Sequence, residues 1–510
     1  MLNGLVQLAR SLRTGVILAR EGALSLVDPA PLPPPLRLGL RVARMIERPG
    51  LGAGRLPAAL VRLGPSYVKF GQFLATRPDI AGVQAARELE QLQDRMAPFS
   101  ADIAARVVED NIGAPIPERF ASFGAPVAAA SIAQVHRAVL PDGRAVAVKV
   151  MRPGVRERFT RDLQAMRFMA RVVERLSPDA ERLKPREVVE TLARSVGLEM
   201  DLRLEAAAMS ELADNTRDDQ DFRVPRPEWE LTGRDVLVSE WIDGVRLNDR
   251  AAILAAGHDP QALGRTVIQS FLRQAIRDGF FHADMHPGNL FVDAQGRLVA
   301  VDFGIMGRLG FKERRFLAEI LLGFIRRDYL RVAEVHFEAG YVPAHHAVAD
   351  FAQAIRAIGE PIHQRRADEI SMAKLLTLLF EVTALFDMRT RTELVMLQKT
   401  MVVVEGVARS LDPRLDMWTT AEPVVRAWIE RNIGPLGQAE ALGRAARTLA
   451  KVVSDVPDLA RRAERVLVRL DEAAERGVAG HLVRVETKRE WIVTLAFCVA
   501  AFALLVMALR

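Results

Sequence analysis

The sequence predicts an α+β fold of two lobes, a small lobe built on strands and a larger helical lobe. The small lobe is predicted because apolar residues alternate with others between residues 126 and 150, and again in "DVLVSEWIDG", residues 235–244. The large lobe is predicted from the helical pattern that prevails between residues 243 and 415. With 510 residues, 50% of them hydrophobic, the chain can bury the cores of two or three domains.

Further helical regions are predicted on both sides of these lobes. A proline-rich linker, "DPAPLPPPLRLG", occupies residues 28–39. The predicted order is a basic N-terminal region with this linker (1–65), a helical extension (66–125), the small lobe (126–242), the helical lobe (243–415), amphipathic helices (416–490) and a transmembrane helix (491–509).

The N-terminal region is strongly basic, since residues 1–64 contain nine arginines and three acidic residues. Leu, Val and Ile recur at helical intervals among the arginines of "LVQLARSLRTGVILAR", residues 5–20. Such an amphipathic helix can lie on an anionic membrane surface. A solvated helix that packs on the rest of the protein explains the pattern equally well.

The C-terminal segment "WIVTLAFCVAAFALLVMAL", residues 491–509, contains no charged side chain. As a helix it would span about 28 Å, close to the thickness of the bilayer core. We predict a transmembrane helix here; a buried helix of a soluble domain is the alternative. Lys488 and Arg489 precede the segment, which by the positive-inside rule keeps the large domain on the cytoplasmic side.

Composition limits the compartment and the partners. The single cysteine, Cys498, excludes an intrachain disulfide and fits a reducing compartment. The net charge of +6 is modest for 510 residues, and basic residues are scattered among acidic ones. Nucleic acid is therefore not an expected partner.

The segment "FHADMHPGNLFV", residues 281–292, gathers polar groups that have two possible uses. On a strand, His282, Asp284 and His286 would share one face, where they could bind zinc or iron. Pro287 and Gly288 argue against this metal site, because they end any strand directly after His286.

Asp284 also begins a second pattern, with Asn289 five residues later and Asp302, Phe303 and Gly304 starting thirteen residues after Asn289. Protein kinases place a catalytic base, a magnesium-binding Asn and a magnesium-binding Asp in this order. The pattern therefore predicts phosphoryl-transfer chemistry, with Asp284 as the base and Asn289 and Asp302 as magnesium ligands.

A lysine suited to phosphate binding lies upstream in "GRAVAVKVMRPG", where valines alternate around Lys149 on a predicted strand. An ammonium group on a largely buried strand needs an acidic partner. Candidate partners follow on a predicted helix: Glu199, Asp201 and Glu205.

The expected glycine-rich phosphate loop does not precede this strand. In its place "PVAAASIAQVHRAVL" carries Ala128, Ala129, Ala130 and Ser131. Glycine adopts positive φ freely and brings backbone N–H groups onto phosphate, whereas alanine meets a steric cost at positive φ. We expect a stiffer loop that holds the phosphates differently.

Together these motifs resemble the UbiB/ABC1 family of atypical protein-kinase-like proteins, which is associated with ubiquinone biosynthesis. The resemblance covers roughly residues 60–415, and its most specific signs are "AAAS", "HADMHPGN" with "VDFG", and "YVKFGQFLATRPD" at residues 67–79. Protein kinases outside the family lack the last motif. The resemblance implies a bilobal protein-kinase-like fold with a helical extension, and ATP or ADP with Mg²⁺ as cofactors.

The resemblance also implies a role for each matched residue. Lys149 would contact the α and β phosphates and pair with Glu205, while Asp284 would act as the base. The remaining implied positions are the phosphate loop Ala128, Ala129, Ala130 and Ser131, the adenine-contacting hinge from Glu240 to Ile242, the magnesium ligands Asn289 and Asp302, and Lys69 and Gln72 facing the acidic pair Glu199 and Asp201.

The function implied is that of an unorthodox kinase or an ATPase that acts on membrane-embedded quinone precursors. The implied partners are membrane lipids, polyprenyl quinone precursors and other ubiquinone-biosynthesis proteins, at a bacterial-type inner membrane with a single C-terminal anchor. A nucleotide-binding pseudokinase scaffold is the alternative, although the residues that only chemistry requires are present. An oxygenase would need a flavin fingerprint, and "GLGAGR" at residues 50–55 lacks its third glycine and follows no strand.

Overall fold

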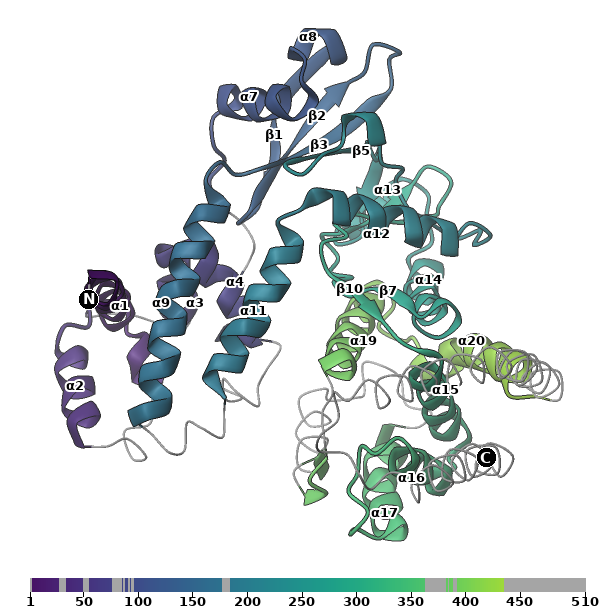
Figure 1. Cartoon of the computed structure of the whole chain (residues 1–510). Coiled ribbons are helices and arrows are strands. Elements are labelled where there is room, and N and C mark those ends of the chain that lie inside the picture. The colour runs from purple at the N-terminus through teal and green to yellow at the C-terminus, as the bar shows by residue number, and fades with distance from the viewer. Residues whose placement is uncertain are drawn as a thin grey trace, which may run out of the picture. The chain divides into compact units, whose positions relative to one another are not determined.

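The computed structural model describes residues 2–26, 34–48, 55–75, 96–176, 184–362 and 392–434, with a few residues between 85 and 92 and between 382 and 388 (Figure 1). The chain divides into two compact units, residues 1–429 and 430–510, and the first contains the site described below. Residues 435–510, with the predicted transmembrane helix 491–509, lie outside the described residues. In the described part of the chain no helix combines the length and the apolarity that a membrane crossing needs.

The N-terminal region forms a group of helices: α1 (Leu2–Arg20), the 3-10 helix η1 (Ala23–Leu26), α2 (Pro34–Met45), α3 (Arg55–Leu63) and α4 (Pro65–Ala75). Leu60, Leu63 and Val68 form an apolar core between α3 and α4. Helix α1 packs on α3 and on α9 (Val155–Leu176), so one of its faces is a protein contact. The predicted linker at residues 28–39 was too long, because Pro34 already begins α2, a position that tolerates its missing N–H.

A four-stranded antiparallel sheet follows: β1 (Ser122–Ala129), β2 (Ala133–Val139), β3 (Ala145–Met151) and β5 (Val236–Glu240), in the order β1-β2-β3-β5. Helices α7 (Ala101–Ile112) and α8 (Ile116–Arg119) precede it. The core on one face joins Ala104 and Val108 of α7 to the alternate valines of β3 and β5. The apolar residues whose alternation predicted these strands are the ones that are buried in this core. The first strand begins at Ser122 rather than at residue 126.

Among the described residues between β3 and β5, three helices follow one another: α9, α11 (Pro185–Glu199) and α12 (Leu202–Asn215). Helices α9 and α11 pack together, and α4 contacts α9. The side chain of Arg158 on α9 donates to the carbonyl of Leu63 at 2.9 Å, which joins the N-terminal helices to the insertion. The helical extension is thus attached to α9, the first of the helices that lead to α12.

The following region mixes short strands with helices. A second sheet has the order β4-β9-β8-β6, from β4 (Phe222–Arg223), β6 (Gly244–Arg246), β8 (Leu290–Asp293) and β9 (Leu298–Ala300), and β7 (Phe280–His282) pairs with β10 (Met306–Arg308). The loop at 283–289 therefore lies between β7 and β8, and residues 301–305 lie between β9 and β10. The remaining elements are η2 (Trp229–Leu231), α13 (Arg250–Ala255), α14 (Pro260–Leu272), the π-helix η3 (Arg273–Asp278), α15 (Phe311–Arg326), α16 (Tyr329–Glu338), α17 (Val348–Gly359), η4 (Glu360–Ile362), α19 (Thr392–Leu411) and α20 (Met417–Asn432). The predicted α+β organisation with a helical N-terminal extension is confirmed.

Candidate active site

Lys149 is the centre of a cluster of charged side chains. It lies on β3 between valines that are buried in the sheet core, so its own side chain belongs to the opposite face. Its Nζ donates to both carboxylate oxygens of Glu205 on α12, at 2.8 and 2.9 Å, and to Oδ1 of Asp302 at 2.8 Å. One ammonium group therefore holds two carboxylates that lie 56 and 153 residues further along the chain.

The cluster fixes the charge of its members. Burial by itself would lower the pKa of Lys149, but the carboxylates of Asp302 and Glu205 raise it well above its usual value. The Lys149 ammonium in turn lowers the pKa of Asp302. Burial raises the pKa of Glu205, and the attraction of Lys149 opposes that rise. Lys149 is therefore cationic and Asp302 is ionised at neutral pH.

The backbone at Asp302 is strained. Its φ of 63° lies in the left-handed region, which costs a residue other than glycine about 1 kcal/mol or more. The next residue, Phe303, is buried, and its backbone N–H bonds to Glu205. The Asp302 carboxylate is half exposed beside Lys149. The strained turn thus anchors Phe303 in the core while it leaves the carboxylate accessible.

Asp284 and Asn289, predicted as base and magnesium ligand, lie together. The amide Nδ2 of Asn289 donates to the backbone carbonyl and to Oδ2 of Asp284, both at 3.1 Å. The N–H of Val301 donates to the carbonyl of Asn289 at 2.9 Å, which joins this loop to the residue before Asp302. The two motifs found in the sequence are thus hydrogen-bonded to each other through the backbone.

His282 occupies a structural position that the sequence did not reveal. It is fully buried, its Nδ1 accepts from the N–H of Asp284 at 3.1 Å, and its Nε2 bonds to the carbonyl of Val301 at 3.2 Å. Burial lowers its pKa, so the ring is neutral at pH 7 with its proton on Nε2. Both nitrogens are engaged, and among the described residues His282, Asp284 and His286 do not form a group whose ligand atoms lie within 4.8 Å of one another, so the alternative of a metal site at these three residues is wrong.

Two other supports of this loop also had no signal in the sequence. Gln274, buried in η3, accepts from the N–H of His282 at 3.1 Å. Thr400, on α19, donates its hydroxyl to the carbonyl of Ala283 at 3.0 Å. A polar side chain in a helical pattern gives no hint of the loop that it supports, whether eight residues away, as for Gln274, or 117, as for Thr400.

Lys69 forms a second buried ion pair. Its Nζ lies 2.7 Å from Oε2 of Glu199 at the end of α11, and the two side chains are 12% and 11% exposed. Its charge also lowers the pKa of Asp302, after the larger effects of Lys149 and burial. Asp201 is the N-cap of α12 and bonds to Arg203 at 2.9 and 2.6 Å. Of the expected acidic pair, Glu199 forms the ion pair with Lys69, and a role for Asp201 opposite this segment stays a prediction.

Gly71 and Gln72 lie on α4 beyond Lys69. A Cβ on Gly71 would come within 2.4 Å of Leu92 and 2.5 Å of Leu60, so glycine here permits close packing of α4 on its apolar neighbours. Gln72 lies three residues after Lys69, on the same side of the helix, and is partly buried. A catalytic role for Lys69 and Gln72 stays a prediction.

The alanine loop avoids positive φ. Among the described residues, positive φ outside glycine occurs at four positions, and none of them is in Ala128–Ala130. The Ala130 N–H donates to the carbonyl of Ala133 at 2.8 Å and closes the hairpin, while its own carbonyl accepts from Arg152 at 2.9 Å. Ser131 is fully buried. The loop is held by these bonds, without the steric cost of positive φ.

The predicted hinge follows β5. Glu240 ends this strand and pairs with Arg223 at 2.9 Å, and the Trp241 N–H donates to the carbonyl of Ala145 at 3.1 Å. Ile242 is partly buried. The hinge is therefore joined to the first residue of β3, four positions before Lys149; adenine contact there stays a prediction.

Two family models match this chain. Residues 91–336 match the ABC1 atypical kinase-like domain, and residues 355–416 match the UbiB helical domain. A solved structure of the Rv3197–erythromycin complex from Mycobacterium tuberculosis is 25% identical, with a TM-score of 0.47, over 79% of this chain and 98% of that chain.

Two curated relatives match at higher identity. The probable protein kinase UbiB of Marinobacter nauticus is 40% identical over 446 residues, which cover 86% of this chain and 82% of the relative. The protein of the same name from Cellvibrio japonicus is 40% identical over 483 residues, 92% of this chain and 88% of the relative. The chain has a kinase-like fold and belongs to the UbiB family of ABC1 atypical kinase-like proteins.

Proposed function

We propose that the protein binds ATP or ADP with Mg²⁺ at the Lys149 cluster and uses the nucleotide for phosphoryl transfer or hydrolysis. The observation that carries this proposal is the meeting of Lys149, Glu205 and Asp302, from three separate elements, at 2.8 to 2.9 Å. In protein kinases a paired lysine positions the nucleotide phosphates, and the Asp of the Asp-Phe-Gly motif holds magnesium. In this chain Asp302 begins that motif, after the β8–β9 hairpin.

The donor set fits magnesium. This ion prefers oxygen ligands and is commonly held by one or two carboxylates together with phosphates. Asp302 is ionised and half exposed, and Asn289 uses its Nδ2 to bond Asp284, so its amide oxygen remains for a cation. When bound, the ion would neutralise charge on the phosphates.

The chain's own groups have distinct tasks in this proposal. Lys149 would exchange its bond to Asp302 for the nucleotide phosphates while Glu205 keeps it in place. Asp284, oriented by Asn289 and by the neutral ring of His282, would accept the proton of the acceptor hydroxyl or of water.

We further propose that the acceptor is small or lipid-borne, in support of ubiquinone biosynthesis at a membrane. The Lys69–Glu199 pair supports this part, since it brings the helical extension close enough to act on the charge of Asp302. An extension at this position would restrict the access of a peptide.

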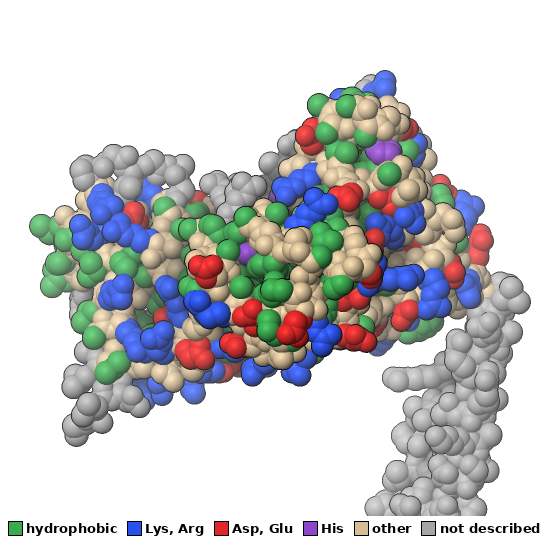
Figure 2. Space-filling model, turned by 90° about the horizontal axis from the view of Figure 1, so that it is seen from above, with side chains coloured by type: hydrophobic (Ala, Val, Ile, Leu, Met, Phe, Trp, Pro, Cys, Tyr) green, Lys and Arg blue, Asp and Glu red, His purple; other side chains and the backbone are tan. Residues whose placement is uncertain are grey.

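The exposed face of α2 supports membrane contact. Leu38, Val42 and Met45 recur at helical spacing and are exposed, Leu38 by 63% and Met45 by 83%, and Ile46, directly after the helix, is exposed too. Arg41 is also exposed on this helix. Figure 2 shows hydrophobic and basic side chains side by side at the left of the view, where α1 and α2 lie. An apolar stripe beside arginines suits the interface of an anionic bilayer.

Nucleotide turnover by the purified full-length protein tests the proposal. We expect turnover to rise when vesicles carry phenolic polyprenyl precursors, and to fall at least tenfold in Asp284→Asn. Asp284→Asn should still be stabilised thermally by Mg–nucleotide, whereas Asp302→Asn should lose much of that stabilisation. Nucleotide binding without turnover under every condition would favour the scaffold alternative, and no stabilisation of the parent protein would refute the nucleotide site.

A further inference from the structure

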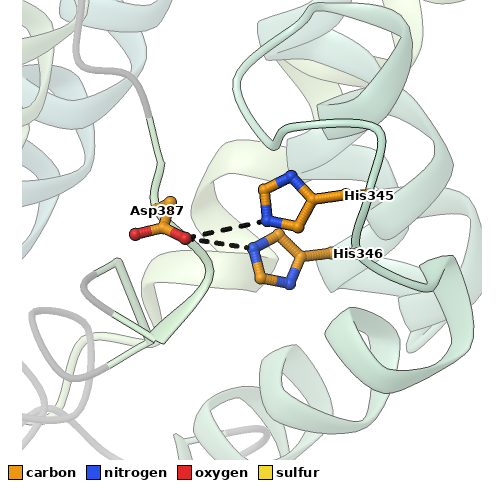
Figure 3. A group of neighbouring side chains, drawn as sticks. All are labelled: His345, His346 and Asp387. Atoms are coloured by element: carbon orange, nitrogen blue, oxygen red, sulfur yellow. Dashed lines mark ion pairs between the residues drawn. The ribbon is translucent and has the colours of Figure 1, made fainter.

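A second cluster of potential metal ligands lies apart from the Lys149 cluster. His345 and His346 lie in the connection between α16 and α17, and Asp387 comes from the segment that precedes α19 (Figure 3). The Nε2 atoms of His345 and His346 lie 3.8 and 3.5 Å from the same oxygen, Oδ2 of Asp387. In the described part of the chain this is the one group of three or more such side chains whose ligand atoms all lie within 4.8 Å of one another.

The spacing fits a small divalent transition metal. Zinc bonds to imidazole nitrogen and carboxylate oxygen at about 2.0 to 2.2 Å, so neighbouring ligand atoms of a tetrahedral site lie about 3.3 Å apart. The histidine–aspartate separations of 3.5 and 3.8 Å are a few tenths of an ångström longer than this, and the ligand atoms of all three residues lie within 4.8 Å of one another, so rotation of these side chains can bring them to ligand distances. Two imidazoles and one carboxylate are a ligand set that zinc prefers, whereas magnesium and calcium prefer oxygen ligands.

The proposed ligands lie next to an apolar core. Phe386 is 6% exposed and packs in the cluster that contains Tyr329 and Phe351, and its ring contacts that of His346 with centroids 5.2 Å apart. The rings of His345 and His346 lie with centroids 4.1 Å apart. The residue that carries the carboxylate is thus placed over the histidines by its buried neighbour.

The backbone conformation of Asp387 also supports a ligand site. Its φ of 48° is in the left-handed region, which aspartate and asparagine adopt more readily than other residues with a Cβ, but still at a cost. Such strain concentrates at ligand sites, where the surrounding structure holds it. An ion pair alone is a weak reason for it, because the His345 and Asp387 side chains are 65% and 69% exposed and exposed pairs contribute little.

We propose that His345, His346 and Asp387 form a binding site for a divalent transition metal of the zinc class. The three ligands leave a fourth position for water or another ligand. The ion would join the α16–α17 connection to the segment before α19, the helix whose Thr400 supports Ala283 in the loop of Asp284. The site stands apart from the nucleotide proposal, and either can fail without the other.

Zinc binding by the chelator-stripped full-length protein tests the site, with zinc sulfate as the probe in calorimetry and Co²⁺ as a spectroscopic substitute. We expect one ion per chain, a tetrahedral Co²⁺ absorption spectrum, and affinity that falls on acidification because ligation needs neutral imidazoles. Asp387→Asn and His345→Ala should each weaken zinc binding at least tenfold. Asparagine tolerates the left-handed backbone, so Asp387→Asn tests the charge with little change in folding.

His258→Ala is the matched control, a histidine outside the cluster, and it should bind zinc like the parent protein. Unchanged melting temperatures of the metal-free variants would show that folding is intact. Absence of zinc binding by the parent, or equal affinity of the parent and Asp387→Asn, would overturn the proposal and leave the cluster as an ion pair.

Discussion

At the scale of single residues, the site depends on one lysine that serves two carboxylates. Glu205 is 8% exposed and Lys149 16%, so bulk water cannot solvate either charge if its partner is lost. Removing one member of a buried pair typically costs about 3–5 kcal/mol, because the other charge stays buried without compensation. The cluster is therefore a determinant of stability as well as a candidate phosphate site.

Lys149→Met should lower the free energy of unfolding by several kcal/mol and abolish stabilisation by Mg–nucleotide. Adding Glu205→Gln should recover much of the stability, because a neutral amide needs no counter-ion, while nucleotide stabilisation stays absent. Urea unfolding with and without nucleotide measures both effects. A single variant as stable as the parent would show that the pair is not buried in solution.

A second residue-scale prediction concerns the Lys69–Glu199 pair. If the extension restrains kinase chemistry, Lys69→Met and Glu199→Gln should each raise autophosphorylation, and glycine at Ala128–Ala130 should act in the same direction. Phosphorylation of generic peptides by the parent should be poor. Lys184→Met removes an exposed lysine and is the control. Strong peptide phosphorylation by the parent that none of these changes alters would contradict the restraint.

At the scale of elements, α2 shows how a short helix can have two apolar sides. Leu40 is buried against the other N-terminal helices, while Leu38, Val42 and Met45 face outward. Folding of the described residues needs only the first side. The second is left for contact with another surface.

Deletion of residues 491–509 should release much of the protein from membranes, since this segment is the predicted transmembrane helix. In that shortened chain, Leu38→Ser with Met45→Ser should reduce the remaining co-sedimentation with anionic vesicles several-fold. Leu198→Ser on α11, also 63% exposed in the parent, is the control. If the full-length protein fractionates as soluble without detergent, residues 491–509 form a core helix instead.

At the scale of the whole molecule, buried histidines couple folding to pH. Burial lowers the pKa values of His136, His282 and His336. As pH falls through about 6.5, these residues take up protons in the unfolded chain but stay neutral in the folded chain. Their neutral state therefore contributes to the free energy of unfolding above that pH, and this contribution is lost below it. Asp302, whose pKa is lowered, loses its contribution only below about pH 4.

The free energy of unfolding should therefore decrease as pH falls from 6.5 to 5.5, by up to about 1.4 kcal/mol per pH unit for each histidine. Urea unfolding at several pH values measures the slope. His136→Gln should flatten the slope by up to about 1.4 kcal/mol per pH unit, the share of one histidine. A stability that stays constant or rises on acidification would contradict the linkage.

The sequence by itself determined the local features of this protein. Alternating valines predicted β3 because the period of a strand is two, and the order of Asp284, Asn289 and Asp302 predicted the residues of a kinase-like site. The helical N-terminal extension and the family likewise followed from short motifs. Each of these conclusions depends on residues that are close in the chain.

The tertiary structure decided how these charges meet. The residues alone left Glu199, Asp201 and Glu205 as candidates for Lys149, and only the family resemblance singled out Glu205. In the structure α11 ends at Glu199 and α12 begins after its N-cap, Asp201. This break places Glu199 beside Lys69, Asp201 beside Arg203 and Glu205 beside Lys149. The same is true of the neutral ring of His282 and of the carboxylate that faces His345, because such pairings depend on how distant elements pack and not on their spacing in the sequence.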